Sequence, residues 1–162
     1  MIPAKRLYEQ ATAKVTKQNL PVPARPKGTD PEIEFPDDPA ELTGPELSQK
    51  MMRAAGWYAF NEWLRGRCES ELVAVDAEYR YLVNTKGNEL RQDPVFKNRS
   101  GEIIEAEVLL RYSAELSEIQ TKRVELLTIK PQLESRSNIY DRLYAALSRE
   151  QSRRESQTRV TG

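Results

Sequence analysis

Histidine is absent from this 162-residue sequence, and cysteine occurs once, as Cys68. Without histidine the chain has no imidazole base and no Ser-His or Cys-His nucleophile pair. One cysteine cannot form an internal disulfide or supply the thiolate set of a structural zinc site. Lys27-Gly28-Thr29 lacks the upstream glycine of a phosphate-binding loop. These absences predict a protein that is not an enzyme and that uses neither a metal nor a cofactor.

Net charge and long apolar runs are also lacking. The 25 basic and 25 acidic residues cancel to a formal net charge of zero, so any electrostatic site must be local. No apolar run approaches the roughly 20 residues that a membrane span needs, and the first residues lack the apolar segment of a secretory signal. We therefore expect a cytoplasmic protein without a membrane partner.

The first 42 residues differ in composition from the rest of the chain. Six of the ten prolines fall between positions 21 and 39, which leaves too few backbone donors for a helix or a sheet. We expect residues 1–42 to form an extended, flexible, proline-rich arm. It is either a solvated tail or a tether that binds a partner or shields a basic site. A short helix over 4–18 would have a single apolar ridge: Leu7, Ala11 and Val15.

A first long helix is predicted to begin at a capping-box sequence, Thr43-Gly44-Pro45-Glu46. Gly87, directly after Lys86, is the expected left-handed end of this helix. A loop over 87–101 should follow. Along the helix, apolar residues recur at three- and four-residue steps and predict one buried face: Leu47, Met51, Ala54, Trp57, Phe60, Leu64, Cys68, Leu72, Val75, Tyr79 and Leu82.

A second long helix is predicted to begin at Ser100, to kink at Pro131 and to end near residue 155. The predicted fold is all-α: two long amphipathic helices over 43–155 in an antiparallel coiled-coil hairpin, followed by a disordered tail over 156–162. The second helix carries a heptad seam: Leu109, Tyr112, Leu116, Ile119, Arg123, Leu126, Lys130, Leu133, Ser137, Tyr140, Tyr144 and Leu147.

The apolar stripes exceed what one hairpin can bury, so a homo-oligomer is expected. The polar seam positions Arg123, Lys130 and Ser137 would fix its register or its number of chains. The expected interface residues are Trp57, Phe60, Leu116, Ile119, Leu126, Leu133, Tyr140, Tyr144 and Leu147.

Two groups of residues are candidates for binding nucleic acid. Trp63 falls off the apolar stripe, beside Arg65 and Arg67. Such a group fits an oligomer interface, where aromatic residues and arginine are enriched, or a surface on which the bases of a single strand stack. The second group is either solvated loop charge or a rim that follows phosphates: Arg80, Lys86, Arg91, Lys97 and Arg99.

Acidic residues of the first helix and Cys68 are the remaining candidates for chemistry. The acidic residues are interleaved with Arg65, Arg67 and Arg80, which predicts a salt-bridged solvent face rather than a catalytic pair. Cys68 lies on the apolar stripe and is predicted to be a small core residue. The acidic residues are Glu69, Glu71, Asp76 and Glu78.

The layout resembles the UvsY-type recombination mediators of tailed phages. The resemblance covers about residues 50–150 and lies in Trp63-Leu64, a charged helix that ends near Lys86, a polar loop, and a second helix that ends Leu133-Glu134-Ser135-Arg136-Ser137-Asn138-Ile139-Tyr140-Asp141. It implies a small, helical, oligomeric protein that binds single-stranded DNA and helps load a recombinase onto strands covered by single-stranded-DNA-binding protein, in the host cytoplasm.

The same resemblance implies that Lys86 lies near the DNA-contacting stretch of the family. Together with Arg65, Arg67 and Arg80 it would contact phosphates, and Trp63 would stack on bases. The alternative function is a structural or scaffolding coiled-coil protein, such as part of a phage particle, with no nucleic-acid role.

Overall fold

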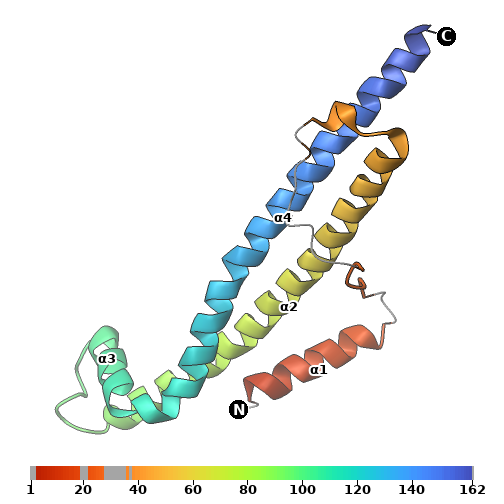
Figure 1. The fold of residues 1–162 in the computed structure, drawn as a ribbon. Helices are drawn as coiled ribbons and strands as arrows, with labels where there is room; N and C mark the ends of the chain where they lie inside the picture. Colours follow the sequence, from red (N-terminus) through yellow and green to blue (C-terminus); the bar gives the residue numbers. More distant parts are fainter. Residues whose placement is uncertain (1–2, 19–21, 28–35, 37, 162) are drawn as a thin grey trace. The chain divides into compact units, whose positions relative to one another are not determined.

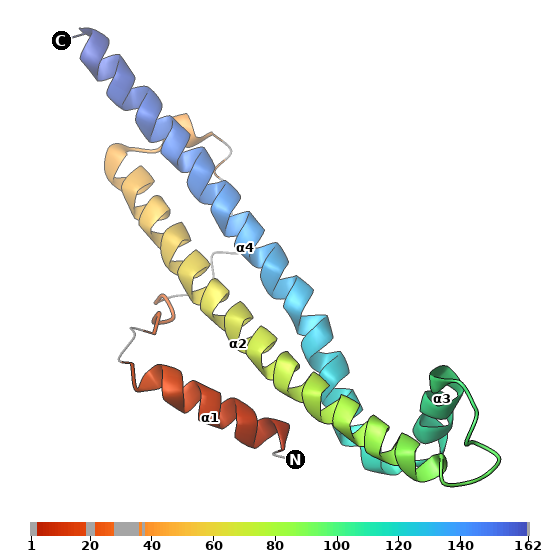
Figure 2. The ribbon, with the colours of Figure 1, turned by 180° about the vertical axis from the view of Figure 1, so that it is seen from behind.

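The computed structural model describes residues 3–18, 22–27, 36 and 38–161. Within these ranges all regular secondary structure is helical, which confirms the predicted all-α class (Figure 1 and Figure 2). No helix there is long and apolar enough to cross a membrane. The elements are α1 (Ala4–Thr16), a short 3-10 helix η1 (Pro39–Glu41), α2 (Gly44–Leu90), α3 (Gly101–Arg111) and α4 (Ser113–Thr161).

Packing divides the chain into two compact units. Unit 1 consists of Met1–Leu20 and Arg67–Lys130, and unit 2 consists of Pro21–Gly66 and Pro131–Gly162. Each unit therefore contains one part of α2 and one part of α4. This division differs from the arm and body expected from composition, because the two ends of the arm pack on different units.

In unit 1, the α2 and α4 segments run in opposite directions. Cys68 lies against Leu126, with 3.5 Å from its thiol sulfur to the backbone oxygen, whereas Lys86, further along α2, pairs with Glu115, earlier on α4. At one end, α3 joins them in a shared core. This core buries Leu90 of α2, Ile104 and Val108 of α3, and Leu116 of α4.

The predicted short helix near the N-terminus is present as α1, and it belongs to unit 1. Its contacts are at one end: the backbone N–H of Ala4 donates to Glu78 at 2.5 Å, and Tyr8 accepts a hydrogen bond from Arg67 at 2.9 Å. Its single apolar ridge, Leu7, Ala11 and Val15, is exposed. Polar contacts therefore dock α1, which the apolar pattern could not indicate.

In unit 2, the α2 and α4 segments are also antiparallel and share an apolar core. Leu47 and Ala54 of α2 pack with Leu143 and Leu147 of α4. The capping box at the start of α2 is confirmed. The Thr43 N–H donates to the Glu46 carboxylate at 2.8 Å, and the Glu46 N–H donates to the Thr43 hydroxyl at 3.4 Å.

Arg154 of α4 holds the chain that leads into α2. One of its guanidinium nitrogens donates to the backbone oxygens of Pro39, Ala40 and Leu42 at 3.3, 3.1 and 2.6 Å. Glu150, whose side chain is 8% exposed, pairs with Arg154 at 2.6 Å and with Arg153 at 2.7 Å. Hydrogen bonds from Arg153 and Arg154 lower the pKa of Glu150 to about 2.

The predicted apolar face of α2 is buried or half-buried at every position from Leu47 to Leu82. The predicted end of the helix at Gly87 is wrong, since α2 continues to Leu90. A Cβ atom added to Gly87 would lie 3.0 Å from Cγ2 of Ile104. Glycine is therefore explained here by the close approach of α3 and not by a left-handed turn.

The predicted second helix is divided in two. Ser100 occupies the N-cap position of α3, although its side chain makes no capping hydrogen bond, and the helical path breaks at Tyr112, with φ −108° and ψ 22°. The break lets Ile104 and Val108 of α3 face Leu116 of α4 in one core. The connecting loop is accordingly shorter than predicted and spans 91–100.

The heptad seam is buried or half-buried at every position except Tyr144, which is 41% exposed. Pro131 lies inside α4; a kink there stays a prediction, as does a coiled-coil hairpin that spans both units. The helix expected to end near 155 extends to Thr161. Ser156 and Thr158 donate to backbone oxygens one turn earlier within this extension.

Gly87→Ala and Gly66→Ala should differ in stability. Alanine in a helix interior is favoured over glycine by about 1 kcal/mol, and a Cβ at Gly66 meets nothing within 4 Å. We expect Gly66→Ala to raise the free energy of unfolding by up to this amount and Gly87→Ala to gain less or to destabilise, because Ile104 must move. Chemical denaturation measures both. Equal gains would contradict a close approach of α3 to α2.

Glu150→Gln should make the free energy of unfolding depend less on pH under acidic conditions. A carboxylate whose pKa falls from its usual 4.5 to about 2 on folding stabilises the folded state above pH 4.5 and loses that contribution as the pH falls toward 2. The wild-type protein should therefore lose stability across this window more steeply than the variant, as followed by denaturation at several pH values. Parallel profiles would show that Glu150 keeps an ordinary pKa.

Candidate functional site

The residues predicted to bind nucleic acid are divided between the units. Trp63 and Arg65 belong to unit 2, whereas Arg67, Arg80 and Lys86 belong to unit 1. Arg65 forms an ion pair with Glu62 at 2.7 Å, and Arg67 donates to Tyr8. Arg80 is exposed. No unit brings the five predicted residues together.

Lys86 is surrounded by groups that stabilise its charge. Its Nζ atom lies 3.2 Å from Glu115 and 3.3 Å from Glu89, and 4.6 Å from the ring centre of Tyr112. Hydrogen bonds to Glu115 and Glu89 raise the pKa of Lys86. A phosphate at this position would have to compete with two carboxylates, which reduces the value of Lys86 as a DNA contact.

The predicted salt-bridged face exists, and it also includes cations of α4. Three carboxylates of α2 pair with cations of α4. The pairs are Glu69 with Lys130 at 3.4 Å, Glu71 with Lys122 at 3.4 Å, and Asp76 with Arg123 at 2.5 Å. The described ranges contain no cluster of three or more residues suited to holding a metal ion.

Cys68 is a buried core residue, as predicted. Its thiol lies against the backbone oxygen of Leu126, and burial raises its pKa. A raised pKa keeps the sulfur protonated and poorly nucleophilic at neutral pH.

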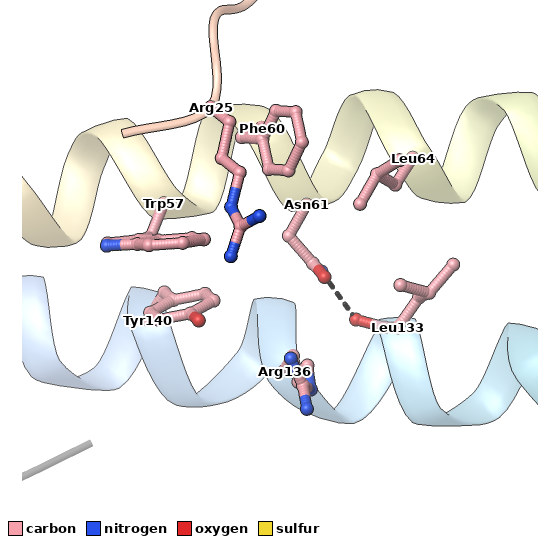
Figure 3. Close-up of a pocket in the computed structure, with 8 residues that line it drawn as sticks. All are labelled: Arg25, Trp57, Phe60, Asn61, Leu64, Leu133, Arg136 and Tyr140. Carbon is pink, nitrogen blue, oxygen red and sulfur yellow. Dashed lines mark hydrogen bonds between the residues drawn. The ribbon is translucent and has the colours of Figure 1, made fainter. Parts of the chain in front are cut away.

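Unit 2 contains a cavity of about 380 Å³ that combines aromatic, apolar and cationic side chains (Figure 3). We call it the unit 2 cavity. Its lining comes from α2, from α4 and from the described segment 22–27 of the arm. The lining residues are Arg25, Trp57, Phe60, Asn61, Leu64, Leu133, Arg136 and Tyr140.

Three aromatic contacts form one continuous group along this cavity. Trp57 is stacked on Tyr140, with ring centres 6.4 Å apart and planes 16° apart, and meets Phe60 edge-on at 6.2 Å. The ring centres of Phe60 and Trp63 lie 5.7 Å apart. Trp57 is 5% exposed, and its indole N–H has no hydrogen-bond acceptor within the described part of the chain. The group therefore connects the predicted residue Trp63 with the cavity.

A buried polar network lies beside these rings. Asn61, which is 4% exposed, donates to the backbone oxygen of Leu133 at 2.6 Å and to the Ser137 hydroxyl at 2.7 Å. The Ser137 hydroxyl donates to Glu62, and hydrogen bonds from Arg65 and Ser137 lower the pKa of Glu62. This network joins α2 to α4 at one register.

Two guanidinium groups supply the positive charge of the unit 2 cavity. Arg136 comes from α4, and Arg25 comes from the arm and lies 5.9 Å from the ring centre of Trp57. Sequence reasoning missed both residues, and it missed Asn61. A polar residue within the apolar stripe of α2 was an available signal for Asn61. Pairing of the arm with α2 had no signal, because it joins distant parts of the chain.

A larger cavity in unit 1, of about 570 Å³, is a weaker candidate. Its lining carries both signs of charge, and two of its charged groups, Lys122 and Glu71, pair with each other. Tyr8 is its sole aromatic lining residue within the described ranges. The unit 2 cavity is therefore the better candidate for a ligand that contains both a ring and an anion.

The residues expected at an oligomer interface mostly have partners within one chain. Trp57, Leu116, Leu126, Tyr140 and Leu147 are buried there. The other four are half-buried, apart from the exposed Tyr144. These contacts already account for the apolar character of the seam, and an interface between chains stays a prediction. The half-buried residues are Phe60, Ile119 and Leu133.

Comparison of this chain with models of protein families, with curated proteins and with solved structures finds no significant match.

Asn61→Leu should destabilise unit 2. The substitution removes two hydrogen bonds and leaves Ser137 without a buried donor, which costs about 1–3 kcal/mol. Asn138→Leu, at an exposed position of α4, is the matched control and should change stability by less than about 0.5 kcal/mol. Chemical denaturation measures both variants. Similar small effects would show that the network contributes little to folding.

Proposed function

We propose that this chain is a self-associating helical accessory protein that binds single-stranded DNA and assists recombinase loading in phage recombination or replication. The unit 2 cavity is the observation that supports this best, because it places aromatic rings beside the guanidinium group of Arg136. Aromatic rings accept any base by stacking, and arginine adds charge and cation–π contacts. Its partners would be further copies of itself, a recombinase and a single-stranded-DNA-binding protein, in the host cytoplasm.

In this proposal the binding surface centres on unit 2. Trp63 is half-buried and touches Phe60, which lines the cavity, so a base stacked on Trp63 would lie next to the cavity. Arg136 would then neutralise a phosphate. Arg80, Arg67 and Lys86 of unit 1 would act as additional contacts, with Lys86 the weakest because of its carboxylate partners.

A structural or scaffolding coiled-coil protein, such as part of a phage particle, is the second candidate. It is favoured by the ion pairs that join α2 and α4 in unit 1. Lys122, Lys130 and Arg123 each face a carboxylate there, so these cations serve folding and are poorly available to a phosphate chain. A scaffold would assemble through its helical surface and would not need cations that are available to bind phosphate.

Fluorescence anisotropy with labelled single-stranded DNA at two salt concentrations tests the proposal. Arg136→Ala should weaken binding to all sequences and lower the magnitude of the salt slope by about 0.7, the value for one lost phosphate contact. Arg142→Ala, at an exposed position of the same helix outside the cavity, is the matched control and should leave the slope unchanged. A loss on Arg80→Ala but not on Arg136→Ala would move the site to unit 1.

The same titration separates stacking from assembly. Trp63→Ala should weaken binding without a change of slope, because stacking releases no counterions. Light scattering on the variant gives its mass in parallel, and equal losses of binding and mass would assign Trp63 to an oligomer interface. Wild-type protein that does not bind DNA at low salt would leave the scaffold as the better function.

A further inference from the structure

Segment 22–27 of the arm, Val-Pro-Ala-Arg-Pro-Lys, lies on unit 2 without regular secondary structure. Figure 3 shows the Arg25 side chain extending from this segment into the space between Trp57 and Asn61. The neighbouring Pro26 is also in contact with α2. Its Cγ atom lies 3.5 Å from the place that a Cβ atom on Gly56 would take. Two adjacent residues of the segment therefore contact two adjacent residues of α2.

These contacts have the chemistry of peptide recognition. Proline-flanked segments dock on aromatic grooves because proline restricts the unbound chain, so little entropy is lost on binding. The guanidinium of Arg25 over the Trp57 ring adds a cation–π contact. Ala24, Arg25 and Lys27 remain exposed, so the contact area between the segment and α2 is small.

The docked segment occupies the space beside the Trp57 ring in which a nucleobase would have to stack. One face of Trp57 is used by Tyr140, and Arg25 lies over the same ring. With the segment in place Trp57 is only 5% exposed. A nucleobase could therefore stack on Trp57 only after Arg25 has left.

We propose that segment 22–27 is an intramolecular ligand of the unit 2 cavity, which competes with single-stranded DNA for Trp57 and is displaced when DNA binds. The docking of the segment is independent of the proposed function, whereas the competition rests on it. Two measurements separate them.

The first measurement needs no DNA. In a Trp63→Phe background, Trp57 is the sole tryptophan of the chain, so acrylamide quenching reports its exposure. Arg25→Ala should raise the quenching constant by about two- to fivefold. Loss of an exposed cation–π contact shifts the equilibrium between the docked and undocked segment by about this factor. Lys27→Ala removes the same charge from the same segment and should have no effect. Arg25→Lys should restore part of the protection. Unchanged quenching on Arg25→Ala would overturn the docking.

The second measurement is the affinity for labelled single-stranded DNA in the chain that keeps Trp63. Arg25→Ala should tighten binding by a similar factor although it removes a positive charge, and Lys27→Ala should not. Weaker binding on Arg25→Ala would overturn the competition and make Arg25 a phosphate contact. Raised quenching with no DNA binding by any variant would confirm the docking and refute both the competition and the proposed function.

Discussion

The antiparallel contact between α2 and α4 is the interaction on which each unit depends. Long helices with one narrow apolar stripe are not stable as isolated helices in water, so their stability comes from the partner that covers the stripe. Apolar contacts alone would tolerate a shift of one helix along the other. Asn61 with Ser137 in unit 2, and Asp76 with Arg123 in unit 1, are polar pairs that a shifted register would break.

The pairing of α2 with α4 also determines which charged and aromatic side chains could bind a ligand. In unit 1 the cations of α4 face carboxylates of α2, which fits a chain whose formal net charge is zero. In unit 2 the facing residues include an aromatic pair, Trp57 and Tyr140. The Arg25 guanidinium lies over the Trp57 ring and makes a cation–π contact there.

Local signals in the sequence predicted local structure well. The capping box at Thr43 and the apolar stripe of α2 depend on residues within a few turns of each other, and both are confirmed. Features that join distant residues were missed. Gly87 has the sequence context of a helix end, but the approach of Ile104 keeps it inside α2. The break at Tyr112 likewise lets α3 pack on α2 and α4 in one core. The position of Arg25 depends on its contact with Trp57, which is distant in sequence.

Arg154 has a consequence for how unit 2 opens. Its guanidinium bridges a late turn of α4 to three backbone oxygens just before α2 begins. The chain before α2 cannot leave without breaking these three hydrogen bonds, and this part of α4 cannot fray without releasing the same oxygens. The two regions lie more than a hundred residues apart in sequence, yet they should exchange their amide hydrogens as one cooperative group.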